Sequence, residues 1–187
     1  MTVPFPRGYV GTNHETIGSD IIAVLSVLRL PELVLGKELY AELRGIKADE
    51  WYPIGKMLTV LELLDQKLGR SALFSTGQAV FRTSHEAKAK AAFKSAHALV
   101  HAFDALYKHA NRGENIGGWK VMAWSPGRAE LEKTTPHHCA MEEGIMHRAL
   151  ECVGVTAQVV QTTCIRKGAD HCRYLVTSPV VDARWGP

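Results

Sequence analysis

Two cysteines stand eight positions apart around a glycine in the stretch CIRKGADHC, residues 164–172. If this stretch is the loop end of a hairpin centred on Gly168, the side chains of Cys164 and Cys172 face each other on one side of a sheet. Two facing thiols can bind a metal ion, form a disulfide or pack as small apolar groups, and a tetrahedral metal site needs four ligands. The spacing alone leaves these interpretations open.

The segment before this hairpin offers further metal ligands. Residues 136–153 carry apolar side chains at helical spacing, and His138, Cys139 and Glu142 fall within or at the edge of the apolar arc. A carboxylate on such a face needs a cation, a hydrogen-bond donor or a shifted pKa. Glu142 lies one turn from Cys139 and can join it around an ion, or it can reach the rim and pair with a lysine or arginine. Both interpretations stay open.

The order of predicted elements defines an α+β fold, with a helical N-terminal half packed on a small antiparallel sheet. Apolar periodicity and capping residues predict helices over 15–29, 37–44, 49–68, 71–81 and 84–109. A hairpin of 119–124 with 129–133, the helix at 136–153 and a final hairpin of 155–165 with 171–177 follow. We expect one domain over residues 1–178 and a loose C-terminal tail over 179–187.

Composition excludes several classes of function. The 187 residues are 46% hydrophobic and 22% charged, with a net charge of +3 and no cluster of lysine and arginine, so we expect no direct nucleic-acid binding. The longest apolar run, 21–30, contains Ser26 and Arg29 and predicts no membrane insertion. The N-terminal stretch MTVPFPRGYV predicts no signal peptide. A cytoplasmic location follows, where a disulfide is disfavoured.

Common catalytic motifs are missing from the sequence. There is no Gly-x-Ser-x-Gly, no phosphate-binding glycine loop and no His-Glu-x-x-His. We therefore expect a binding protein and not an enzyme.

The stretch from PHHCAMEEG through GVTAQVVQTTCIRKGADHCRYLV resembles the end of vinyl-reductase-type (4VR) domains, which include ligand-binding sensory domains. The resemblance implies a zinc site with Cys139, Cys164 and Cys172 as ligands. In that family the fourth ligand is a glutamate three residues before the second cysteine, where this chain has Gln161. The substitutes available in this chain are Glu142, His138 and His171.

The same resemblance implies a ligand pocket. Aromatic-sensing members line it with a tryptophan about twenty residues before the first cysteine, which corresponds to Trp119, and with a histidine from the preceding helix. His97 and His101 are the candidates, although they share a stripe with lysines that is typical of a solvated face. Trp119 can equally be a core residue. The apolar face of the predicted helix over 84–109 supplies the remaining candidates, Phe93, Phe103 and Tyr107.

These features support three hypotheses for function. The first is a sensory domain for a small hydrophobic, aromatic or lipid-like ligand, which forms a homodimer and signals through an unidentified partner. The second hypothesis is a haem protein, because the chain is similar in length and layout to the haem nitric-oxide-binding (H-NOX) family. This similarity implies haem bound by His101 or His97. The stretch WSPGR at 124–128 matches that family's Tyr-x-Ser-x-Arg motif only loosely. The third is a dimeric scaffold, because trafficking-complex subunits have a similar fold.

Overall fold

The computed structural model describes residues 13–187, so MTVPFPRGYV and its predicted lack of a signal peptide lie outside the described residues. The strands are β1 (Glu15–Ile17), β2 (Trp51–Pro53), β3 (Asn111–Arg112), β4 (Trp119–Ser125), β5 (Arg128–Lys133), β6 (Gln158–Thr163) and β7 (Cys172–Thr177). The helices are α1 (Gly18–Ser26), α2 (Pro31–Leu35), α3 (Lys37–Leu43), α4 (Gly55–Val80), α5 (Glu86–Ala92), α6 (Ala96–His101), α7 (Phe103–Ala110) and α8 (Cys139–Cys152), with short turns of helix at Phe81–His85, Ile165–Lys167 and Ala183–Trp185.

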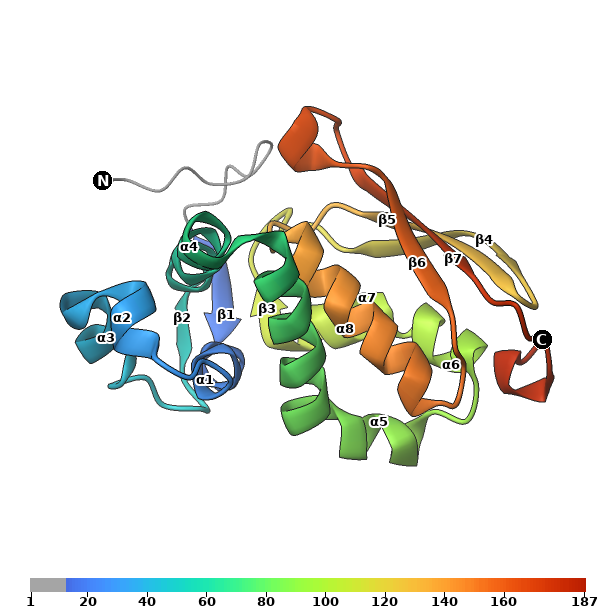
Figure 1. Cartoon of the computed structure of the whole chain (residues 1–187), viewed down its shortest axis with the longest axis horizontal. Coiled ribbons are helices and arrows are strands. Elements are labelled where there is room, and N and C mark those ends of the chain that lie inside the picture. Colours follow the sequence, from blue (N-terminus) through green and yellow to red (C-terminus); the bar gives the residue numbers. More distant parts are fainter. Residues whose placement is uncertain (1–12) are drawn as a thin grey trace.

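The predicted α+β class is confirmed. A four-stranded antiparallel sheet has the order β4-β5-β7-β6, so the two predicted hairpins lie side by side through the β5–β7 pairing. Figure 1 shows α8 between this sheet and the second part of α4, with α1 to α3 on the far side of α4. The buried side chains form one cluster between the sheet and α8 and a second within the N-terminal helices.

A second, three-stranded sheet with the order β2-β1-β3 was not predicted. Its strands have three residues or fewer, which is too short to show the alternation by which a strand is recognised in sequence. β1 replaces the start of the predicted helix over 15–29, so α1 begins only at Gly18. This sheet joins the start of the chain to the end of α7 through the β1–β3 pairing.

The two helices predicted over 49–68 and 71–81 correspond to α4, which breaks at Gly69. The predicted start at 49 is wrong, because β2 takes Trp51–Pro53 and α4 begins only at Gly55. The backbone of Gly69 has φ 77° and ψ 176°, a conformation that other residues rarely adopt. The helical hydrogen bonding resumes at once, so the two parts are continuous in the chain but differ in direction (Figure 1).

The prediction of one long helix over 84–109 is wrong, because the segment forms the three helices α5, α6 and α7. Phe93 has an extended backbone, with φ −114° and ψ 130°, and its side chain packs on the core cluster next to the sheet. Ser95 then caps α6, because its hydroxyl accepts a hydrogen bond from the Ala98 N–H at 3.3 Å. Alanine and lysine favour a helix locally, but burial of Phe93 and the serine cap divide the segment into α5, α6 and α7.

The second part of α4 crosses α8 with the two backbones in close contact. A Cβ atom on Gly77 would collide with the carbonyl oxygen of Met141, and one on Gly144 would collide with that of Phe74. Gly77 weakens the helix by its propensity, yet it is the residue that permits this approach. The two glycines therefore fix the distance between α4 and α8.

The predicted loose tail over 179–187 is packed on the domain in this structure. Trp185 is completely buried, and its indole N–H donates to the Val180 carbonyl at 3.2 Å. The Arg184 guanidinium donates to the Gly154 carbonyl at the end of α8. The Trp185 ring lies 5.2 Å from that of Trp124 on β4, so the C-terminal turn covers the end of the sheet next to α6.

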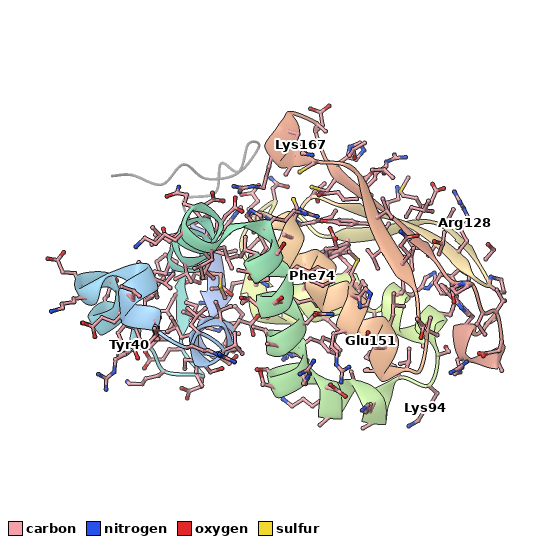
Figure 2. All side chains as sticks on the ribbon, in the orientation of Figure 1. Tyr40, Phe74, Lys94, Arg128, Glu151 and Lys167 are labelled. Atoms are coloured by element: carbon pink, nitrogen blue, oxygen red, sulfur yellow. The ribbon has the colours of Figure 1, made fainter. Side chains whose placement is uncertain are left out.

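No helix within the described part of the chain combines the length and the apolar character that a membrane crossing requires. The basic residues Lys94, Arg128 and Lys167 lie at separate ends of the molecule (Figure 2). This dispersal agrees with the scattered lysines and arginines of the sequence.

The helix crossing leads to a stability prediction. Gly144→Ala should lower the free energy of unfolding by about 1–3 kcal/mol, because the added methyl group must push α8 away from α4. Urea denaturation followed by circular dichroism measures this. Gly45→Ala is the matched control, since its Cβ would make only an ordinary contact 3.5 Å from the Glu42 oxygen. Equal stability of the two variants would contradict the close crossing.

Candidate metal centre and the buried ion pair beside it

Three cysteines from three elements meet in the interior. Cys139 is the first residue of α8, Cys172 is the first residue of β7, and Cys164 directly follows β6. The Cys139 sulfur lies 3.2 Å from that of Cys172 and 3.7 Å from that of Cys164. All three sulfurs lie within 4.8 Å of one another and are buried. We call this set the thiol cluster; the fourth cysteine, Cys152, is buried elsewhere and is not part of it.

The hairpin brings Cys164 and Cys172 together through an irregular register. The symmetric register about Gly168 predicted from sequence applies only to the pair Thr163↔Arg173, because the register shifts between Gln161 and Thr163. Cys164 therefore lies just past its strand and does not pair directly with Cys172. The main-chain N–H of Ile165 points back and donates to the Cys172 sulfur at 3.3 Å.

The thiol cluster favours one negative charge. The thiol of Cys172 donates to Cys139, and with the nearby Lys133 cation this lowers the pKa of Cys139 to about 3 despite its burial. The pKa of Cys172 is raised, first by this hydrogen bond and then by burial. Cys139 is thus the thiolate of the pair, and a thiolate is the form that binds metal ions.

A buried ion pair lies beside the thiol cluster. Lys133 is the last residue of β5, and its side chain is completely buried. Its ammonium group lies 2.5 Å from the Glu142 carboxylate and 3.7 Å from the Cys139 sulfur. It also donates to the His137 carbonyl at 2.6 Å. The Thr135 hydroxyl donates to the other Glu142 oxygen at 2.7 Å. Glu142 therefore receives both a cation and a hydroxyl donor from the segment 133–137.

His137 completes this polar group. Its Nδ1 lies 3.7 Å from Glu142, and its Nε2 has no hydrogen-bond partner within residues 13–187. Burial, with the positive charge of Lys133, lowers the pKa of His137 to about 3, so its imidazole is neutral. The ring packs edge-on against Tyr107.

The structure does not bring Glu142 into the thiol cluster. Its carboxylate is engaged by Lys133 and Thr135, which sequence analysis did not include among the site residues. Lys133 could have been found, because it continues the inward alternation of Ala129 and Leu131 along β5. Gln161, at the position of the family's glutamate, acts as a hydrogen-bond donor that lowers the pKa of Cys139.

The two histidines considered as substitute ligands have other partners. His138 caps α8 through its Nδ1, which accepts from the Ala140 N–H, and its Nε2 lies 3.3 Å from Asp65 on α4. His171 lies 3.7 Å from Glu132 on β5. Neither histidine joins the three sulfurs within 4.8 Å.

The tip of the β6–β7 hairpin is anchored to the N-terminal helices. Arg166 stands between the two cysteines of the hairpin and binds both oxygens of Glu62 on α4, with Nη2 2.7 Å from Oε2. Glu62 is buried, and the Arg166 guanidinium also lies 3.7 Å from Asp65. Because Asp65 contacts His138 as well, the first part of α4 holds both the hairpin tip and the start of α8.

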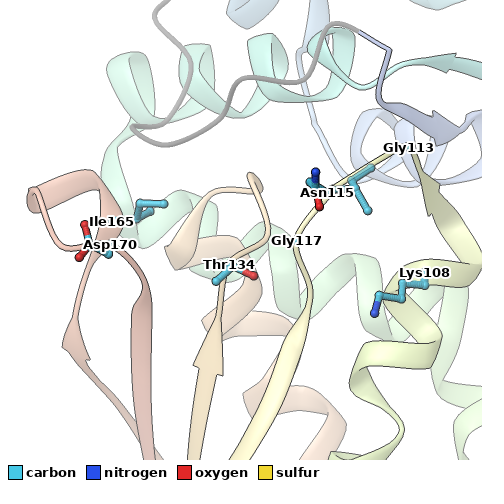
Figure 3. Close-up of a pocket in the computed structure, with 8 residues that line it drawn as sticks. Lys108, Gly113, Asn115, Gly117, Thr134, Ile165 and Asp170 are labelled. Carbon is cyan, nitrogen blue, oxygen red and sulfur yellow. The ribbon is translucent and has the colours of Figure 1, made fainter.

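None of the residues predicted to bind a hydrophobic ligand lines the pocket described within residues 13–187. Phe103 and Tyr107 are buried, Trp119 is half-buried and packs on Phe103 and Tyr174 with ring distances of 5.8 Å, and Phe93 packs on the core cluster. Their role in ligand binding stays a prediction. A pocket of about 550 Å³ lies elsewhere (Figure 3), lined by Lys108, Gly113, Asn115, Ile116, Gly117, Thr134, Ile165 and Asp170.

His97 and His101 lie at the edge of the sheet and not in the interior. Their ring centroids are 4.0 Å apart, and they lie 5.2 and 5.6 Å from the ring of Trp124 on β4. His101 is exposed, whereas Leu99 and Val100 of the same helix are buried in the core. The solvated stripe considered in the sequence analysis therefore describes these histidines better than a pocket wall does.

The architecture is that of an H-NOX domain. An H-NOX protein from S. oneidensis, a triple mutant in the Fe(II) ligation state, is similar with a TM-score of 0.68 and 17% identity over 89% of this chain and 98% of that chain. Fe(II) unliganded H-NOX protein from K. algicida has a TM-score of 0.68 and 12% identity over 88% of this chain and 97% of that chain. The S. oneidensis protein in the Fe(II)NO state has a TM-score of 0.67 and 18% identity over 87% and 99% of the two chains.

At these identities the similarity establishes the fold alone. The H-NOX layout expected from the sequence is confirmed for the fold, and the comparisons do not support the vinyl-reductase-type assignment. No known protein family matches the sequence, and no curated protein does.

The ion pair leads to a prediction on stability. Lys133→Met leaves the Glu142 carboxylate buried without its cation and should lower the free energy of unfolding by about 3–5 kcal/mol in urea denaturation. The double variant Lys133→Met/Glu142→Leu should recover most of this loss, because the Glu142 charge is removed together with its cation.

The control is Lys108→Met, which removes an exposed ion pair with Asp104 and should cost about 1 kcal/mol or less. A loss in Lys133→Met no larger than in this control would show that the buried pair does not form.

Proposed function

We propose that this chain is a sensor domain built on the H-NOX scaffold, with a structural zinc ion at the thiol cluster, and that it signals through a partner protein and performs no catalysis. The observation that supports this proposal is the convergence of three buried sulfurs from α8, β6 and β7 beneath a hairpin that is anchored to the N-terminal helices. Such a site connects α8 to the β6–β7 hairpin. The hydrophobic-ligand and homodimer hypotheses stay predictions of the sequence.

The donor set fits zinc. Three sulfurs within 4.8 Å of one another can serve as ligands of one ion, and soft thiolates prefer zinc among the abundant divalent metals. Cys139, Cys164 and Cys172 would hold the ion, which would neutralise thiolate charge and join helix to sheet. Gln161 stands where the resembling family has its fourth ligand, and its side-chain interaction with Cys139 lowers the pKa of that thiol.

Zinc content gives a direct test of the metal site. The parent protein should retain about one zinc ion per chain in native mass spectrometry, and Cys172→Ser should lose it and melt at a lower temperature. Cys152→Ser is the matched control, since Cys152 is a buried cysteine outside the thiol cluster. It should keep its zinc. Zinc-free parent protein after expression and dialysis with excess zinc would contradict the site.

Haem-based gas sensing is the second candidate function, because structures in the H-NOX group are described by Fe(II) and NO ligation and by haem distortion. All nine histidines of the chain lie within the described residues, so each candidate ligand can be located. The two predicted ones, His97 and His101, pack on Trp124 beside the C-terminal turn and do not face the core. These two residues do not fit a haem iron, but the similarity to H-NOX structures supports haem better than it supports zinc.

Haem titration separates the two candidates. With added hemin, the zinc-loaded protein should give no Soret band of a histidine-ligated haem, and His101→Ala should leave the spectrum unchanged. The S. oneidensis H-NOX protein is the positive control. A one-to-one Soret band that is lost in His101→Ala or His97→Ala would overturn this order and establish the haem-based candidate.

A further inference from the structure

A pair of histidines stands on the outer side of α6, apart from the thiol cluster. His97 and His101 occupy positions i and i+4, and their ring centroids are 4.0 Å apart with the planes tilted by 36°. Two histidines at this spacing lie on one side of a helix and can bind the same metal ion.

One ring is already oriented as in many metal ligands. The Nδ1 of His101 lies 2.9 Å from the main-chain carbonyl of His97. A carbonyl only accepts hydrogen bonds, so Nδ1 is the donor, and in the neutral ring of this tautomer the lone pair is on Nε2. Metal-binding histidines commonly donate their second N–H to a carbonyl in this way. Within residues 13–187, neither His101 Nε2 nor the His97 ring has a hydrogen-bond partner.

The surroundings favour a metal ion over an ion pair. Among the described residues, no carboxylate pairs with either ring, whereas His138, His147 and His171 each lie near one. The neighbours are Trp124 and the C-terminal turn, where Gly186 lies against the Cβ of His97. His101 is exposed, so water can complete the coordination of a bound ion.

We propose that His97 and His101 form a surface site for a divalent transition-metal ion, with Cu²⁺ as the tightest ligand and Ni²⁺ and Zn²⁺ weaker. Imidazole nitrogens suit these three ions, and a flexible two-histidine site follows their general order of affinity. The site is distinct from the thiol cluster in its donor atoms and its exposure, and it does not depend on the proposed zinc ion. Occupancy changes how both rings contact Trp124, which links the bound ion to the C-terminal turn.

The test uses the full chain without an affinity tag, with the thiol cluster saturated by zinc. Ni²⁺ is the probe, because Cu²⁺ oxidises free thiols. Titration calorimetry should give one saturable site in the parent, and tryptophan fluorescence should be quenched in parallel because Trp124 touches both rings. His97→Ala and His101→Ala should each weaken Ni²⁺ binding at least tenfold.

Two matched variants make the result specific. His109→Ala removes another exposed helical histidine that has no partner four residues away, and it should bind Ni²⁺ like the parent. Trp124→Phe should keep the binding heat but lose most of the quenching. Thermal melts establish that each variant is folded, and His101→Asn replaces His101→Ala if the alanine variant is not. Equal Ni²⁺ affinity in the parent and the folded His101 variant, or no saturable site in the parent, would overturn the proposal.

Discussion

The buried ion pair between Lys133 and Glu142 fixes how α8 meets the sheet. Lys133 is the last residue of β5, and Glu142 lies in the first turn of α8. Both side chains are almost completely inaccessible to water. A buried charge without its partner is costly, so the first turn of α8 cannot shift along β5 without losing this contact. Cys139 lies in that same turn and directly contacts Cys172, which pairs with Lys133 across β5 and β7. The thiol cluster is thus a consequence of where the ion pair holds the helix.

The N-terminal helices connect to this arrangement through a few contacts. Arg166 at the hairpin tip binds Glu62 in the first part of α4, whereas the second part packs on α8 at Gly77 and Gly144. The break at Gly69 separates these two attachments. The first part of α4 is therefore attached to the hairpin, and the second part is attached to α8.

The comparison with H-NOX structures shows how far a scaffold determines function. This chain reproduces that architecture over nearly the whole length of its neighbours at 11–18% identity. The shared architecture does not establish that the side chains needed to bind a haem are present, because function depends on the residues of the site and not on the fold. Here the histidines of α6 face outward, while the interior beside α8 holds a lysine, a glutamate and three thiols.

The sequence by itself determined the elements that rest on local patterns. The hairpin of β4 and β5, the helix α8 with its end at Gly154 and the final hairpin all follow from periodicity and turn residues within a short stretch. Only the tertiary structure decided the rest. The predicted helix over 84–109 was divided because Phe93 packs, half-buried, against the core cluster. Trp185 was buried by contacts made far along the chain, and Lys133 became the partner of Glu142 because β5 ends beside α8. These outcomes depend on which non-local surfaces meet, and no window of the sequence contains that information.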